Sequence, residues 1–152
     1  MNRDLAVLVI TPEGFSIGKT IALELKAELH IRQAVETGVT EDTGIEKFLS
    51  LGEHVKRIFS RYRGLVFVMS LGIVNRVIAP CLKDKHTDPA VVTVDEAGRF
   101  AISTLSGHEG GANELAYLVS SVTGAEPVVT TASEANRLYI CGIGCKRGEE
   151  GW

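Results

Sequence analysis

Short apolar runs alternate with helix-like stretches along the first part of the chain. Residues 5–10 (LAVLVI) and 65–69 (LVFVM) are continuous apolar runs rich in β-branched residues, a pattern typical of strands buried on both faces. Between them, apolar residues at helical spacing predict helices over 15–29 and 45–62, with a candidate second strand over 29–32. This order is typical of an α/β protein.

The second part of the chain adds a hairpin and two more helices. A turn signal at residues 95–98 separates two short apolar runs and predicts an antiparallel hairpin. The expected elements are a helix over 73–82, strands over 90–94 and 100–105, a helix over 112–123 with Leu115, Leu118, Val119 and Val122 inward, a short strand over 127–129 and a last apolar run over 138–143. Together they predict a layered α/β fold: a mainly parallel sheet with one antiparallel hairpin and helices on both faces.

Length, charge and hydropathy narrow the class of protein. The 152 residues fit one ordinary domain, and 45% hydrophobic residues with 23% charged ones are typical of a globular protein. The net charge is −3, whereas nucleic-acid binders usually carry an excess of basic residues. No run approaches the roughly 18 apolar residues of a membrane span, and the first run is too short for a secretory signal. We therefore expect a cytoplasmic protein with neither a membrane nor a nucleic-acid partner.

The cysteines and the glycine-lysine pair exclude two kinds of site. Three cysteines, of which Cys141 and Cys145 are spaced C-x3-C, match neither a disulfide framework nor a zinc ribbon, so we expect no metal site. Gly18-Lys19-Thr20 resembles the end of a Walker A motif, but no glycine lies five residues before Gly18 and the stretch falls within a predicted helix. A phosphate-binding loop is excluded there.

Three small polar turns follow predicted strands and are the first candidates for a binding site. Ligands of open α/β sheets bind outside the carboxyl ends of the strands, so we expect these turns to line one crevice. Glycines admit close backbone approach, and helix N-termini attract anions, which suits a polyanionic ligand. The residues are Ser70 and Gly72 in the first turn, Ser106, Gly107, Gly110 and Gly111 in the second, and Thr130 and Thr131 in the third. The alternative, that the glycines only tighten turns, remains open.

The histidines differ in their predicted surroundings. His108 is the one histidine in a glycine-rich loop, and imidazole titrates near neutrality, which makes it a candidate acid or base. His30 and His54 lie in or beside predicted helices and are expected on the surface, while the sequence leaves His86 undecided. Arg76 lies one turn after Gly72, where it reaches either a ligand carboxylate or a surface acid.

Residues 65–136 carry a series of longer signatures. In order they are a Gly-Ile-Val-x-Arg turn after a strand, K-x-x-D-P-A-V-V, V-D-E-x-G, S-G-H-x-G-G-A-N and V-x-T-T-A. This series closely resembles the amino-terminal part of the CbiG family, the cobalt-precorrin-5A hydrolases. The first 60 residues resemble that family only in the layout of strand and helices.

The resemblance implies an enzyme of cobalamin biosynthesis. Family members hydrolyse the δ-lactone of cobalt-precorrin-5A and release acetaldehyde, which gives cobalt-precorrin-5B. The cobalt-corrinoid substrate brings its own cobalt, so the resemblance implies no protein-bound metal or cofactor. Lactone hydrolysis needs an acid or base and a group that stabilises the oxyanion, and we predict these roles for residues of the matching motifs. His108 is the predicted general acid or base, and the N–H groups of Gly110 and Gly111 are the predicted oxyanion donors. Asn113 is predicted to orient the site, and Arg76 to hold a carboxylate of the substrate.

Family members are commonly longer than this chain. Residues 138–148 resemble the start of their carboxyl-terminal domain, which divides the chain into residues 1–137 and a tail, 138–152. If the further domain completes the crevice, the alternative function is a non-catalytic tetrapyrrole-binding or partner-docking module. We expect the apolar run 138–143 to join the edge of its own sheet or to pair with a second copy in a homodimer, against the simpler alternative of a disordered tail.

Overall fold

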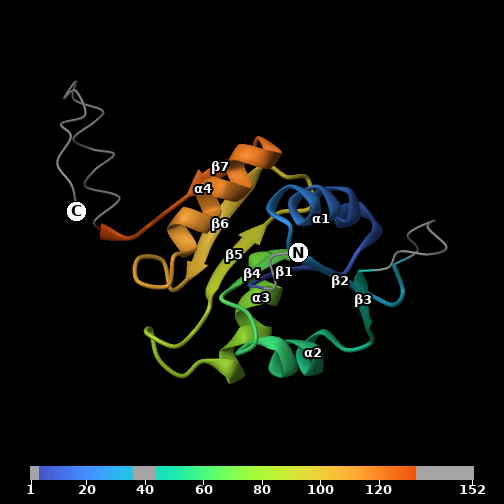
Figure 1. Ribbon diagram of the computed structural model, residues 1–152, viewed down its shortest axis with the longest axis horizontal. Helices are drawn as coiled ribbons and strands as arrows, with labels where there is room; N and C mark the ends of the chain where they lie inside the picture. Colours follow the sequence, from blue (N-terminus) through green and yellow to red (C-terminus); the bar gives the residue numbers. More distant parts are fainter. Residues whose placement is uncertain (1–3, 36–43, 133–152) are drawn as a thin grey trace.

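The computed structural model describes residues 4–35 and 44–132 and contains one seven-stranded sheet, ordered β3-β2-β1-β4-β5-β6-β7 (Figure 1). The strands are β1 (Leu5–Val9), β2 (Glu28–Arg32), β3 (Ile45–Phe48), β4 (Gly64–Val68), β5 (Ala90–Val94), β6 (Phe100–Leu105) and β7 (Glu126–Val128). The helices are α1 (Pro12–Leu25), α2 (Leu51–Ile58), α3 (Leu71–Ile78), the 3-10 turn η1 (Ala79–Cys81) and α4 (Ala112–Thr123).

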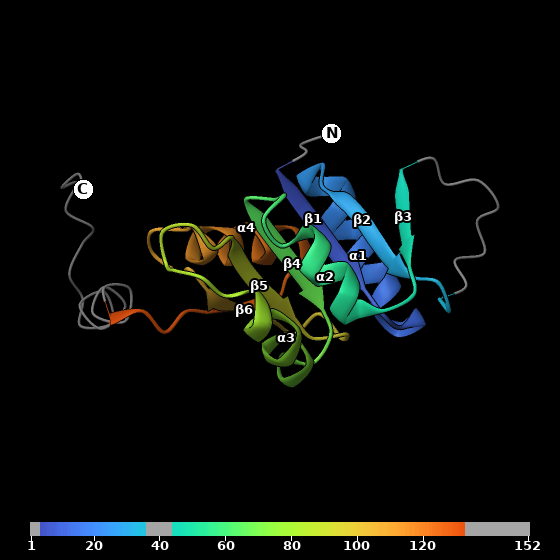
Figure 2. The ribbon, with the colours of Figure 1, turned by 90° about the horizontal axis from the view of Figure 1, so that it is seen from below.

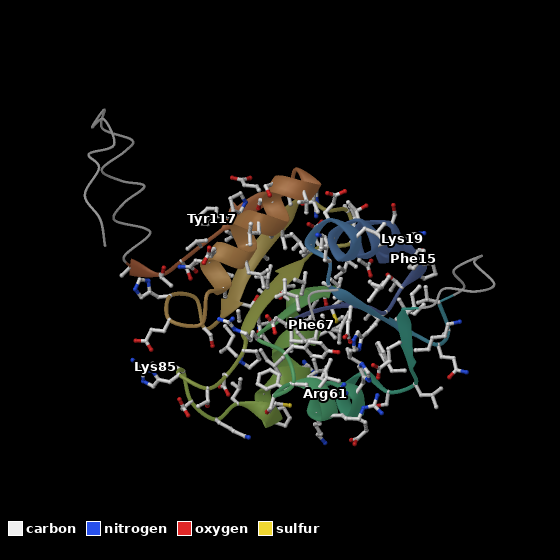
Figure 3. The ribbon with its side chains drawn as sticks, viewed as in Figure 1. Phe15, Lys19, Arg61, Phe67, Lys85 and Tyr117 are labelled. Atoms are coloured by element: carbon white, nitrogen blue, oxygen red, sulfur yellow. The ribbon has the colours of Figure 1, made fainter. Side chains whose placement is uncertain are left out.

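Helices cover both faces of the sheet, as the sequence predicted. Helices α1 and α4 lie on one face and α2 and α3 on the other (Figures 1 and 2). Because side chains alternate along a strand, Val7 and Val9 of β1 pack with the first pair of helices, and Ala6 and Leu8 pack with the second. Phe67 of β4 is fully buried on the second face, near the centre of the molecule (Figure 3).

Strand direction divides the sheet into two parts. Strands β3, β2, β1, β4 and β5 are all parallel. Strand β6 pairs antiparallel with β5, and β7 pairs parallel with β6. The predicted hairpin is thus confirmed. We call the side of the sheet where β1, β4 and β5 end its carboxyl edge. Because the hairpin reverses the chain, β6 and β7 end at the opposite edge, where those strands begin.

The helix predicted over 45–62 is wrong in its first third. Ile45–Phe48 forms β3, which pairs parallel with β2, and Ser50 then caps α2 by accepting a hydrogen bond from the Glu53 N–H. Two apolar residues three positions apart suit one turn of helix as well as a short strand, so spacing alone could not separate them. Helix α1 ends at Leu25, earlier than predicted, because Lys26 adopts a left-handed conformation with φ of 55° and its N–H bonds to the Ala22 and Leu23 carbonyls.

The later helices agree more closely with expectation. Helix α4 has the predicted bounds, but Leu118 is 46% exposed and does not point inward. Helix α3 begins two residues earlier than predicted and ends at Ile78, before Pro80, which lacks the N–H to continue it. No helix of the described segments is long and apolar enough to cross a membrane. The apolar run 138–143 and the tail lie outside the described residues.

Candidate functional site

The three predicted turns do not line one crevice. Ser70 and Gly72 follow β4, at the carboxyl edge of the parallel strands. The loop from Ser106 to Gly111 follows β6, and Thr131 follows β7, so both lie at the opposite edge. The prediction of a single crevice is wrong because the β5–β6 hairpin reverses the chain before the second and third turns.

Two of the predicted turns nevertheless meet a third motif at that opposite edge. The hairpin register places Val91 beside Leu105, so the segments before β5 and after β6 are neighbours. The Ser106 hydroxyl donates to the Asp88 carbonyl at 3.2 Å. His86 Nδ1 lies 2.7 Å from a Glu109 carboxylate oxygen. We call residues 86–88, 103, 106–113 and 131 the motif cluster.

Asn113 holds the motif cluster together. It lies in the first turn of α4 and is 6% exposed. Its side-chain oxygen accepts from the Ser103 hydroxyl at 2.7 Å, and its Nδ2 donates to the Thr131 hydroxyl at 2.9 Å. Its own N–H donates to the Gly107 carbonyl at 3.0 Å. Asn113 therefore joins β6, the loop and the segment after β7, which suits the orienting role predicted for it.

Close packing explains two of the loop glycines. A Cβ at Gly107 would lie 2.8 Å from the Asn113 side-chain oxygen, and one at Gly110 would collide with Ser106. Gly111 has a φ of 85°, which favours glycine, and it precedes α4. The glycines thus shape the turn. The role of the Gly110 and Gly111 N–H groups as oxyanion donors stays a prediction.

Two histidines stand on the exposed side of the motif cluster. His108 is exposed on the loop, between Ser106 and Gly110. The His86 side chain is 64% exposed, on the same loop as Lys85 in Figure 3, and the Glu109 carboxylate fixes its Nδ1 as the protonated nitrogen. Sequence reasoning left His86 undecided and did not select Glu109. The hairpin prediction contained the signal, since it made their two segments neighbours.

The remaining predicted residues lie apart from this cluster or at its margin. Ser70 precedes α3, and its carbonyl accepts from the Ile73 and Val74 N–H groups. Gly72 and Arg76 are exposed on α3, and Thr130 is exposed beside Thr131. At the carboxyl edge, Thr11 caps α1 and its hydroxyl donates to Glu96 at 2.6 Å. Ser70 and Gly72 are therefore separated from the glycine-rich loop by the length of a strand.

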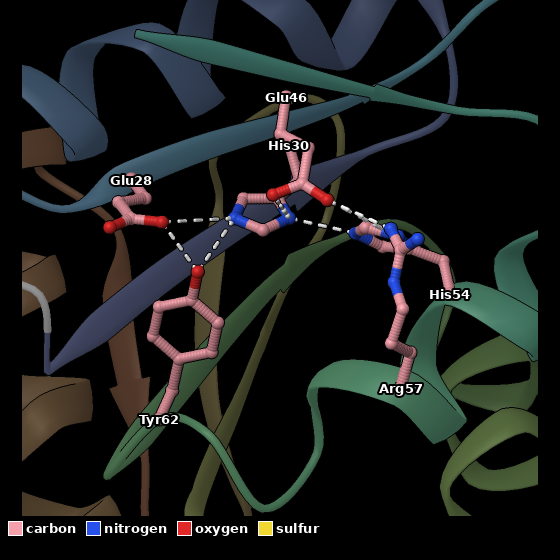
Figure 4. A network of polar contacts seen from close by, with 6 residues as sticks. All are labelled: Glu28, His30, Glu46, His54, Arg57 and Tyr62. Atoms are coloured by element: carbon pink, nitrogen blue, oxygen red, sulfur yellow. Dashed lines mark hydrogen bonds and ion pairs between the residues drawn. The ribbon is translucent and has the colours of Figure 1, made fainter.

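A second polar cluster lies at β2 and β3, across the strand order from β5 and β6, and it shows that the prediction for two histidines is wrong. His30 is fully buried in β2 and His54 is 3% exposed in α2, so the expectation of surface residues is wrong. Leu29 and Ile31 pack beneath α1, so alternation turns His30 toward α2. His54 stacks on Phe48 with ring centroids 4.5 Å apart. We call Glu28, His30, Glu46, His54, Arg57 and Tyr62 the histidine network (Figure 4).

Hydrogen bonds in the histidine network fix the tautomers of both rings. The Arg57 guanidinium can only donate, so His54 Nδ1, 2.9 Å away, accepts from it. His54 Nε2 therefore carries the proton and donates to His30 Nδ1 at 2.7 Å. His30 Nε2 then donates to the Tyr62 hydroxyl at 3.2 Å, and that hydroxyl donates to Glu28 at 2.5 Å.

Burial keeps the network in this neutral form. Loss of water contact, together with the neighbouring His30, lowers the pKa of His54 to about 4. Burial also lowers the pKa of His30, against the opposing effect of Glu46 and Glu28. The pKa of Tyr62 is raised by burial and by its hydrogen bond to Glu28. Both imidazoles are thus uncharged at neutral pH.

Comparison with known proteins identifies what the fold and motifs resemble. The family model for the cobalamin synthesis G amino-terminal domain matches residues 53–134. A cobalt-precorrin-5A hydrolase of Priestia megaterium is 41% identical over 136 residues, which are 88% of this chain and 36% of that protein. One from Salmonella typhimurium is 36% identical over 137 residues, 90% of this chain and 38% of that protein.

The fold also matches a solved structure. A crystal structure of a cobalamin biosynthesis protein G homologue from Sulfolobus solfataricus superposes with a TM-score of 0.64 at 25% identity. The match covers 91% of this chain and 40% of that chain. The chain thus spans well under half the length of the relatives that it matches. The motif cluster falls within the matched family region, whereas His30 and Glu46 precede it.

Proposed function

This chain belongs to the cobalamin synthesis G amino-terminal family, and from that premise we propose that it takes part in opening the lactone ring of cobalt-precorrin-5A. The relatives from Priestia megaterium and Salmonella typhimurium are named for that hydrolysis. One observation links the proposal to particular residues. The motifs around Asp88, Ser106–Asn113 and Thr131 are far apart in sequence and are joined by hydrogen bonds in one cluster.

Lactone hydrolysis sets three chemical requirements. A base takes a proton from water as the water oxygen attacks the acyl carbon, and the carbonyl oxygen gains negative charge. The ring C–O bond then breaks, and the departing alkoxide takes a proton from an acid. The products are a carboxylate and an alcohol on the same molecule. Acetaldehyde then leaves when the C–C bond beside that alcohol breaks, as the hydroxyl gives up its proton and the ring carbon takes one up.

The motif cluster supplies a group of the right type for each requirement. We assign the water-activating base to His86, whose protonated Nδ1 faces Glu109 and whose Nε2 lone pair is then available. His108 acts as the acid that returns the proton, and the N–H groups of Gly110 and Gly111 stabilise the oxyanion. Asn113 is a positioning residue, since its hydrogen bonds hold the loop rather than the substrate.

The test is made in a full-length relative with the same motifs, because the chain covers 36% and 38% of its curated relatives. Replacement of the residue that matches His108 by Ala should reduce acetaldehyde release by about a hundredfold or more if it transfers a proton. A Lys47→Ala equivalent, at an exposed position of β3 outside the cluster, is the control. Wild-type turnover in the His108 variant would exclude the assignment.

The share of the relatives that this chain covers favours a second candidate function. A domain that makes up 36% of a hydrolase can bind the substrate while the rest of that protein supplies part of the catalytic groups. Titration of this chain with a cobalt-corrinoid intermediate separates the two functions. A change in the visible spectrum without acetaldehyde supports a tetrapyrrole-binding module, and acetaldehyde release supports catalysis by this chain.

A further inference from the structure

We propose that His30, Glu46 and His54 bind one divalent transition-metal ion. A nitrogen from each histidine and a carboxylate oxygen of Glu46 all lie within 4.8 Å of one another. The three residues come from β2, β3 and α2, at the end of the sheet away from the motif cluster. The proposed hydrolysis uses none of them. The spacing of the cysteines predicted no metal site, whereas these ligands are two histidines and a carboxylate.

The spacing of the donor atoms is close to that of a metal-bound set. His30 Nδ1 lies 2.7 Å from His54 Nε2 and 3.9 Å from a Glu46 oxygen. Two nitrogens bound to a tetrahedral ion at about 2.05 Å are about 3.3 Å apart, so the rings need to separate by only about 0.6 Å. Two imidazoles and one carboxylate suit zinc, cobalt or nickel rather than magnesium or calcium, which prefer oxygen ligands alone.

The surroundings of His30 are those of a metal-binding histidine. Such a ring usually donates its other N–H to a carboxylate or a similar acceptor, which fixes its orientation. His30 Nε2 faces the Tyr62 hydroxyl at 3.2 Å and a Glu28 oxygen at 3.7 Å. Both acceptors lie on the far side of the ring from His54, so they direct the Nδ1 lone pair toward the proposed ion (Figure 4).

Arg57 holds the metal-free form and can move away from it. Its guanidinium bonds to Glu46 at 2.8 Å and to His54 Nδ1 at 2.9 Å, and its side chain is 60% exposed. When an ion binds, the proton on His54 Nε2 transfers to Nδ1, which Arg57 vacates, so the ring stays neutral. The ion thereby replaces the hydrogen bond between the two histidines. The Glu46 side chain is 37% exposed, so the ion reaches the two histidines from the side on which Glu46 lies.

The test is a direct metal titration of the full chain. Protein is freed of metal with a chelator, exchanged into chelator-free buffer, and titrated with Co²⁺ while the visible d–d bands are followed. We expect one Co²⁺ per chain with the intense bands of a tetrahedral site, displacement by Zn²⁺, and no displacement by Mg²⁺. Thiolate charge-transfer bands would instead place the ion on cysteines and overturn the proposal.

Matched variants locate the ion within the network. His54→Gln and Glu46→Gln should each weaken Co²⁺ binding by more than about a hundredfold, and Glu28→Gln, outside the ligand set, by about ten- to a hundredfold. His86→Gln, which removes an exposed histidine at the other end of the sheet, should leave the affinity unchanged. Because His54 is buried, circular dichroism checks that the His54→Gln variant still folds. If it does not, the Glu46→Gln variant alone tests the ligand set. No binding by the wild-type chain, or equal binding by both ligand variants, contradicts the proposal.

Discussion

His30 and His54 are buried between β2 and α2, whereas His86 and His108 stand on exposed loops around the far end of β5. In the histidine network every ring nitrogen has a protein partner, and burial keeps both rings neutral. In the motif cluster, Asn113 and the glycines are packed, while the two imidazoles face solvent. Exposed imidazoles on a packed loop are suited to contact a ligand, whereas buried imidazoles in a packed network are suited to stabilise the fold or to bind a small ion.

The largest difference between the two regions should appear when a histidine is removed. His54→Ala removes the ring that stacks on Phe48 and leaves His30 Nδ1 without its donor, so the free energy of unfolding should fall by about 4 kcal/mol. His108→Ala, the matched exposed histidine, should change it by no more than about 0.5 kcal/mol. Urea unfolding of both variants checks the pair. Equal losses would mean that the two regions do not differ as described.

Acid should destabilise the chain through the histidine network. In the presence of a chelator, the folded protein keeps a His54 pKa of about 4, below the usual 6.5, while the unfolded chain takes up protons near 6.5. The stabilisation is complete above pH 6.5 and is lost as the pH falls toward 4, by about 3 kcal/mol. Urea unfolding from pH of about 7.5 to about 4.5 measures it. His54→Phe, which cannot titrate, should flatten this dependence, and an unchanged slope would contradict the assignment.

A smaller change should reveal the packing of the glycine-rich loop. A methyl group at Gly110 collides with Ser106, so Gly110→Ala should lower the free energy of unfolding by about 2 kcal/mol. Gly52→Ala is the control, because that position in α2 has open space and alanine favours a helix. Thermal unfolding compares the two. If both variants melt alike, the loop is not packed as described.

Much of the fold could be predicted from local pattern. The runs at β1 and β4 are continuous and apolar because helices cover both faces of the sheet, and the turn at residues 95–98 marked the hairpin. Strand β3 could not be predicted, since four residues at the sheet edge with only Ile45 and Phe48 apolar also fit a turn of helix. Its position depends on pairing with β2, which is not a local property.

The sites required information about strand direction and burial. Sequence reasoning grouped the glycine-rich loop with Thr131 by the rule that ligands bind outside strand ends, and hydrogen bonds through Asn113 do join the two. It placed Ser70 with them because every turn after a strand was assigned to one edge, and only the reversal at β6 separates them. It assigned His30 to the surface because a histidine gives no hydropathy signal for burial. The alternation of Leu29, His30 and Ile31 was the available clue.

A nitrogen–proton NMR titration of this chain with a diamagnetic cobalt(III) corrinoid that carries free carboxylates tests directly whether the motif cluster binds the substrate. It requires binding alone and so applies whether or not this chain is catalytic by itself. If the motif cluster is the binding site, amide shifts will concentrate in residues 83–89, 106–113 and 130–131, and the amides of His30 and His54 will stay in place. Shifts concentrated at Thr11, Ser70 and Glu96, at the carboxyl edge of the parallel strands, would contradict the account.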